Sequence, residues 1–213
     1  MQLHLCRVDT ADEVWLPGLL ARLTPEERTR AERFAVAPAR LSYAAAHALL
    51  HHALDEAIGP GWSMVRGEQG KPALAPPFAD LHFNLTHADG LVAVAINREG
   101  PIGVDVEAAT RAIDVASIGR RVFAAEERGD PLRLWTLKEA VAKATGLGLS
   151  LPFNEIVFDG DPPRLARIRD PHGPAARWWV HGETFAGHWL ALAAPRGGGA
   201  IERVELRVAE LAG

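Results

Sequence analysis

The stretch Gly103-Val104-Asp105-Val106-Glu107 predicts a strand with two unlike faces. Because alternate side chains of a strand point in opposite directions, Asp105 and Glu107 share one face, and Val104 and Val106 share the other. Two carboxylates on neighbouring positions of one face repel each other, and a cation bound between them makes the arrangement favourable. An ordinary half-buried strand with a solvated acidic face is the alternative interpretation.

A helix predicted over residues 132–145 carries groups that could complete such a site. It is capped by Asp130, has Pro131 at its first position and ends at Gly146. Its apolar stripe consists of Leu134, Leu137, Val141 and Ala144. The opposite side holds Trp135, Glu139 and Lys143 at i, i+4 and i+8, with Lys138 at the edge.

If Glu139 faces Asp105 and Glu107, three carboxylates converge. Hard oxygen ligands completed by a substrate phosphate are what Mg²⁺ takes in proteins. A surface helix with a stabilising Glu139–Lys143 pair is the alternative, although a tryptophan is costly on a solvated face.

Composition excludes several classes of protein. The 213 residues fit one large or two small domains, and 48% hydrophobic with 23% charged residues excludes disorder. A net charge of −4 predicts no nucleic-acid partner, and no apolar run is long enough to predict a membrane span. The N-terminus has no signal-peptide pattern, and the single Cys6 fits a reducing cytoplasm and excludes a disulfide framework.

Lysine is rare in this chain. Of 23 basic residues only three are lysines, namely Lys71, Lys138 and Lys143. Lysine supplies a compact point charge that arginine does not replace where an ammonium group must meet phosphate. Chance among so few residues is the alternative explanation.

The remaining pattern predicts an α+β fold. Helices are expected over residues 25–34 and 41–58 as well, the first opened by a capping box at Thr24. Strands are expected over 2–8, 62–66, 81–85, 91–96, 102–106, 153–158, 177–183, 188–194 and 201–208. The segment 97–101 is the best candidate for an internal boundary.

Four motifs in this order resemble the Sfp-type 4′-phosphopantetheinyl transferases. They are GKP at 70–72, FNLTH at 83–87, GVDVE at 103–107 and WTLKEAVAKATGLGL at 135–149. The resemblance implies two similar α+β halves related by a pseudo-twofold axis, with the active site in the cleft between them. Residues 1–100 would bind coenzyme A, and residues 101–213 would bind Mg²⁺ and carry catalysis.

The resemblance also implies roles for individual residues. Mg²⁺ would be bound by Asp105, Glu107 and Glu139, with Glu139 as general base and Lys143 stabilising the leaving phosphate. Coenzyme A would be contacted by Lys71, Thr86, His87, Lys138, Lys143, Arg30 and Arg40.

The chain departs from the usual family pattern at three positions near coenzyme A. Thr86 replaces a serine, Ser42 stands where a basic residue is frequent, and Glu27 stands where a lysine is frequent. Arg40 is expected to substitute partly for the missing basic residue. His47 and His51 share a helix face at i, i+4, and we expect packing there rather than metal binding.

The expected activity is transfer of 4′-phosphopantetheine from coenzyme A to a serine of an apo acyl or peptidyl carrier protein, releasing adenosine 3′,5′-bisphosphate. The expected enzyme is a cytoplasmic monomer. A Mg²⁺-dependent pyrophosphohydrolase that cleaves coenzyme A or a nucleotide without a carrier is the alternative enzyme. A nucleotide-binding module without a catalytic metal is the alternative that is not an enzyme.

Overall fold

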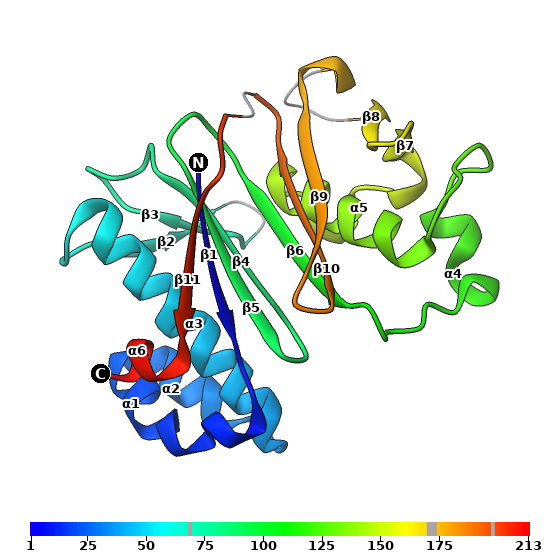
Figure 1. Cartoon of the computed structure of the whole chain (residues 1–213). Helices are drawn as coiled ribbons and strands as arrows, with labels where there is room; N and C mark the ends of the chain where they lie inside the picture. The colour runs from blue at the N-terminus through cyan, green and yellow to red at the C-terminus, as the bar shows by residue number, and fades with distance from the viewer. Residues whose placement is uncertain (68–69, 170–173, 197–198) are drawn as a thin grey trace.

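The computed structural model describes residues 1–67, 70–169, 174–196 and 199–213 and confirms the α+β class. Two sheets pack face to face, and each has helices on its outer side (Figure 1). The first sheet has the order β11-β1-β5-β4, formed by Glu202–Arg207, Gln2–Arg7, Leu91–Asn97 and His82–Ala88. The second has the order β6-β10-β9, formed by Gly103–Ala108, His188–Ala194 and Trp179–Phe185. Only β11 and β1 pair in parallel; the other neighbours in these two sheets are antiparallel.

Alternation along the strands builds the core between the sheets. Leu3 and Leu5 of β1 point to the same interior as Val104 and Val106 of β6, where all four side chains are buried. The residues between them point outward to the helical layers. The acidic strand therefore anchors one face in this core and presents Asp105 and Glu107 on the other.

The outer face of the first sheet is covered by α3 (Ala37–Ile58), with α1 (Leu16–Arg22), α2 (Pro25–Glu32) and α6 (Val208–Ala212) around it. The predicted capping box at α2 is confirmed, since Glu27 N donates to Thr24 Oγ1 and Thr24 N donates to the Glu27 carboxylate. A short hairpin, β2 (Met64–Arg66) and β3 (Pro72–Leu74), follows α3. A 3₁₀ helix, η1 (Thr10–Trp15), precedes α1.

The outer face of the second sheet is covered by α5 (Pro131–Thr145), which begins at the Asp130 cap and ends at Gly146 as predicted. Shorter elements surround α5: α4 (Val115–Val122), β7 (Val157–Asp159), β8 (Arg164–Arg167), and the 3₁₀ helices η2 (Gly148–Ser150), η3 (Phe153–Glu155) and η4 (Ala175–Arg177). The predicted strand over 153–158 is thus wrong in its first half. After Pro152 the chain makes a 3₁₀ turn, because Glu155 N donates to the Pro152 carbonyl.

The predicted boundary segment 97–101 connects β5 of the first sheet to β6 of the second. Strands β4 and β6, from different sheets, lie side by side (Figure 1). A side chain of β4 links them, since Asn84 Oδ1 accepts a hydrogen bond from the backbone Val104 N at 2.9 Å. At the other end of the chain, β11 and α6 return to the first sheet and its helices. None of the helices in the described residues is long and apolar enough to cross a membrane.

Gly103 sets the distance between β6 and α5. A Cβ at this position would lie 1.9 Å from the carbonyl oxygen of Ala140 and 2.6 Å from the amide nitrogen of Ala144, both in the backbone of α5. Without a side chain at Gly103, the helix backbone lies directly on the strand. This contact brings the polar side of α5 over Asp105 and Glu107.

We predict that Gly103→Ala destabilises the protein by about 3 kcal/mol, because neither backbone atom that the new methyl group meets belongs to a flexible side chain. Chemical unfolding measures the loss. Gly199→Ala is the matched control, since a Cβ there meets no atom of the described residues within 4 Å. Equal stability of the two variants would contradict the close contact.

Candidate active site

Asp105 is at the centre of the polar cluster between β4, β6 and α5. The residue is 4% exposed, and its Oδ1 accepts hydrogen bonds from Lys143 Nζ at 2.6 Å and from Thr86 Oγ1 at 3.2 Å. Lys143 Nζ also donates to Thr86 Oγ1 at 3.1 Å and to the Val104 carbonyl at 3.2 Å. The two sheets and α5 therefore meet at one ion pair.

Glu107 is held by a second set of contacts. Its Oε1 accepts a hydrogen bond from Trp135 Nε1 at 3.0 Å and forms an ion pair with Arg111. The guanidinium of Arg111 lies over the Trp135 ring, 5.5 Å from its centroid, and the Phe153 ring packs against the same indole at 5.5 Å. Trp135 is thus not a solvated surface residue: its indole N–H fixes the second carboxylate of β6.

Burial and mutual repulsion act on the carboxylates of this cluster. Burial raises the pKa of Asp105 to about 6; Lys143 opposes the shift, and Glu139 and Glu107 add to it. Burial likewise raises the pKa of Glu139, with Lys143 opposing and Glu107 contributing. The three carboxylates predicted to converge therefore lie within one another's electrostatic field.

These residues fit a divalent cation in their chemistry. Asp105 Oδ2 is buried and has no hydrogen-bond partner within the described part of the chain, which is costly unless a cation or donor meets it. No three Asp, Glu, His or Cys side chains among the described residues are gathered tightly enough to hold a metal ion as they stand. Lys143 occupies the other oxygen of Asp105, so metal binding would require these side chains to rearrange.

A cavity of about 800 Å³ lies between α2, α3 and the β2–β3 hairpin. Three guanidinium groups line it, from Arg30, Arg33 and Arg66, together with the aromatic ring of Tyr43. Its volume is in the range of ordinary small-molecule sites, and its charge suits an anionic ligand.

His87, near the end of β4, is exposed. Its pKa is lowered by burial of part of the ring and by the charges of Lys143 and His47. Both of those residues are therefore electrostatic neighbours of His87. His47 lines the cavity and Lys143 pairs with Asp105, so His87 lies within electrostatic range of both.

The predicted ligand residue Arg40 does not line this cavity, whereas Arg66 does. Arg66 was not anticipated, because one arginine in a short strand carries no pattern that marks it. His47 also lines the cavity, although we expected only helix packing there.

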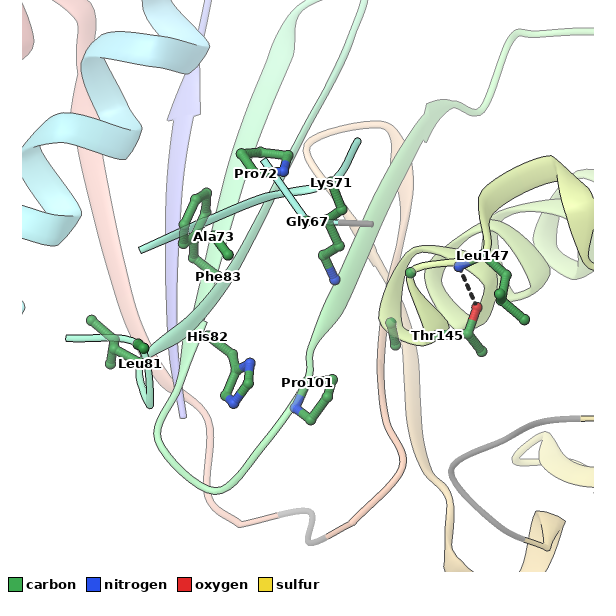
Figure 2. Close-up of a pocket in the computed structure, with 13 residues that line it drawn as sticks. Gly67, Lys71, Pro72, Ala73, Leu81, His82, Phe83, Pro101, Thr145 and Leu147 are labelled. Atoms are coloured by element: carbon green, nitrogen blue, oxygen red, sulfur yellow. Dashed lines mark hydrogen bonds between the residues drawn. The ribbon is translucent and has the colours of Figure 1, made fainter. Parts of the chain in front are cut away.

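Lys71 lies at a second, smaller cavity of about 420 Å³, where its side chain points toward β6 and the end of α5 (Figure 2). Its ammonium group donates to the backbone carbonyls of Lys143, at 2.6 Å, and Ile102, at 3.2 Å. Burial, followed by the charge of Lys143, lowers the pKa of Lys71 to about 8. This lysine fastens the β2–β3 hairpin to the second sheet and its helix, and contact with coenzyme A stays a prediction.

The expectation that Lys138 reaches a phosphate is wrong in this structure. Lys138 is completely buried, and its ammonium group bonds to Glu127 at 2.7 Å and to the carbonyls of Phe153 and Ile156. Glu127 in turn accepts from the amides of Ala124 and Phe158. Helix periodicity predicts Lys138 at the edge of the polar side of α5. In the structure it lies on the buried side, where it pairs with the buried Glu127 carboxylate.

The comparisons with known proteins all point to the same family. The model of the 4′-phosphopantetheinyl transferase superfamily matches residues 101–194. The 4′-phosphopantetheinyl transferase HetI of Nostoc sp. is 33% identical over 186 residues, covering 79% of this chain and 78% of that protein. AcpT of Salmonella typhimurium is 32% identical over 68% of this chain and 74% of its own. Sfp of Bacillus subtilis is 33% identical over 50% and 52%, and both are also named 4′-phosphopantetheinyl transferases.

We predict that Lys138→Met destabilises the protein by about 3–5 kcal/mol, because it leaves the Glu127 carboxylate buried without its cation. The double variant Lys138→Met/Glu127→Gln should recover part of this loss, since glutamine buries no charge. Chemical unfolding measures both variants, and ligand titration of the folded single variant should give wild-type coenzyme A affinity. Unchanged stability with weakened coenzyme A binding would restore the original expectation for Lys138.

Proposed function

The chain belongs to the 4′-phosphopantetheinyl transferase superfamily, and we propose that it transfers 4′-phosphopantetheine from coenzyme A to a serine of an apo acyl or peptidyl carrier protein. The products are the holo carrier protein and adenosine 3′,5′-bisphosphate. One observation carries the proposal most directly. The protein combines the buried ion pair of Asp105 and Lys143 with an arginine-lined cavity of about 800 Å³, a volume in the range of small-molecule sites.

In this proposal the arginine-lined cavity holds the nucleotide end of coenzyme A. The pyrophosphate lies beside Lys143 and close to Thr86 and His87. Thr86 accepts a hydrogen bond from the Lys143 ammonium group, and His87 is near enough for the charge of Lys143 to lower its pKa. Lys143 then changes partners, because a phosphate oxygen competes with Asp105 for its N–H donors. Positive charge at this point stabilises the phosphate that leaves.

Asp105, Glu107 and Glu139 would hold Mg²⁺, which when bound neutralises charge on the pyrophosphate oxygens. The unpartnered Oδ2 of Asp105 supports this assignment. Trp135 contributes by orienting Glu107 through its indole N–H.

Glu139 is the proposed general base that accepts the proton of the carrier serine. Burial raises its pKa toward neutrality, and a base is most effective when its pKa lies near the working pH. The hydroxyl of the serine then attacks the β-phosphorus while the adenosine bisphosphate departs.

We further propose that residues 1–100 and 101–213 form two related halves, with coenzyme A bound mainly by the first and Mg²⁺ by the second. The equivalent layering of a sheet under a long helix in each part supports this division. Because β11 and α6 pack with the first part, the division follows the chain only up to β10. Both halves in one chain suit a monomeric enzyme.

The proposed reaction predicts a mass gain of one phosphopantetheine group on an apo carrier protein incubated with coenzyme A, Mg²⁺ and this protein. Intact mass spectrometry reads this out directly. Cleavage of coenzyme A at an equal rate without a carrier would instead favour the pyrophosphohydrolase. Binding of coenzyme A with neither reaction would favour the binding module.

For the same assay we predict that Glu139→Gln lowers single-turnover transfer by more than the roughly 10²–10⁴-fold typical of losing a general base alone, because it also weakens metal binding. Coenzyme A affinity, measured by titration without Mg²⁺, should stay within about twofold of wild type because the cavity is untouched. The exposed Glu13→Gln serves as the charge-matched control and should transfer at the wild-type rate. A wild-type rate and pH profile in Glu139→Gln would exclude it as the base.

A further inference from the structure

Two acidic residues of α2, Glu26 and Glu27, line the arginine-rich cavity. Glu27 of α2 shares the cavity wall with Arg30, Arg33 and Arg66. A carboxylate facing an anionic ligand would be expected to weaken binding through repulsion. Its contacts with α3 give it a different role.

The Glu27 carboxylate accepts donors from three directions. Oε1 is 2.8 Å from His47 Nδ1, Oε2 is 3.1 Å from His51 Nε2, and Oε2 also accepts the Thr24 N–H at 2.8 Å. The side chain is only 14% exposed. Burial opposes ionisation, but the hydrogen bonds from His47 and His51 dominate and hold the pKa of Glu27 well below its usual range. Glu27 is therefore a charged group whose lone pairs are directed at histidines.

These contacts fix how His47 is presented to the cavity. Because the Glu27 carboxylate can only accept, Nδ1 of His47 donates to it, and Nε2 is the ring nitrogen left for a ligand. Tyr43 packs on the same ring at a centroid distance of 4.2 Å, and Arg30 lies over Tyr43. The ring is thus held by a hydrogen bond at one edge and by stacking on one face.

His47 and Lys143 have a common electrostatic neighbour, His87. The cavity and the ion pair therefore lie in one region of the protein, which suits a ligand with phosphates at two points. Coenzyme A has this form, with a phosphomonoester on its ribose and a pyrophosphate farther along.

We propose that His47, oriented by Glu27, binds the ribose 3′-phosphate of coenzyme A, so that this acidic residue strengthens phosphate binding instead of opposing it. His47 is the binding residue and Glu27 its positioning residue. The proposal rests on the proposed function, because it names the donor that occupies the cavity.

The sign of the effect of Glu27→Gln separates this proposal from simple electrostatics. If Glu27 only repels the ligand, removing its charge tightens binding of coenzyme A. If Glu27 instead holds the His47 ring in the orientation that contacts the phosphate, Glu27→Gln weakens binding. Glutamine still serves at this position of a capping box, so α2 should keep its start.

The experiment titrates the full-length protein with coenzyme A and with 3′-dephospho-coenzyme A. We expect His47→Gln to lower coenzyme A affinity roughly tenfold or more, the range for a hydrogen bond to a charged group, and Glu27→Gln to lower it severalfold. Affinity for 3′-dephospho-coenzyme A should change less than about twofold in both variants. In transfer assays the KM for coenzyme A should rise while kcat stays near the wild-type value.

His52→Gln is the matched control. His52 lies on the same helix and also faces a glutamate, Glu56, at 3.5 Å, but it does not line the cavity. Equal losses for both donors, or tighter coenzyme A binding in Glu27→Gln, would overturn the proposal while leaving the transferase activity intact. A wild-type protein that neither binds coenzyme A nor modifies a carrier would overturn the proposed function itself.

Discussion

The close contact between β6 and α5 at Gly103 is the constraint on which the site depends. A helix backbone lying directly on a strand backbone leaves no room for an intervening layer of side chains. Polar side chains next to this contact, on the strand and on the helix, must therefore meet at short range. Asp105 and Lys143 are such groups, and they form their ion pair because the packing forces them together. The valines on the opposite face of β6 keep the strand from tilting away, since they are buried between the two sheets.

Most of this arrangement could be predicted from the sequence because it follows from short periodicities. The alternation of β6 and the caps of α5 were correct, and the spacing of Trp135, Glu139 and Lys143 put them on one side of the helix. Lys138 could not be placed by periodicity, because its burial depends on Glu127, which lies in a loop eleven residues earlier. A buried ion pair between a helix and a loop leaves no repeating pattern in the sequence.

The cavity shows the same limit more clearly. Its wall is assembled from α2, α3 and β2, so residues far apart in the chain become neighbours only after folding. Sequence spacing correctly associated His47 with His51, but it could not supply Glu27, which is twenty residues earlier. Glu27, which stands where a lysine is frequent in the family, is thus paired with His47 and His51 of α3, and this pairing cannot be recognised from the sequence order.

The parallel pairing of β11 with β1 has a consequence for biosynthesis. Gln2 of β1 and Glu202 of β11 are 200 positions apart, so this pairing must wait until all the segments between the two strands have been made. Until then β1 is an open edge, and the helix α6 that packs against α1 is also missing. The layer that supports the arginine-lined cavity is thus completed only after β11 and α6 are made, and a nascent chain is exposed to mispairing at this edge until then.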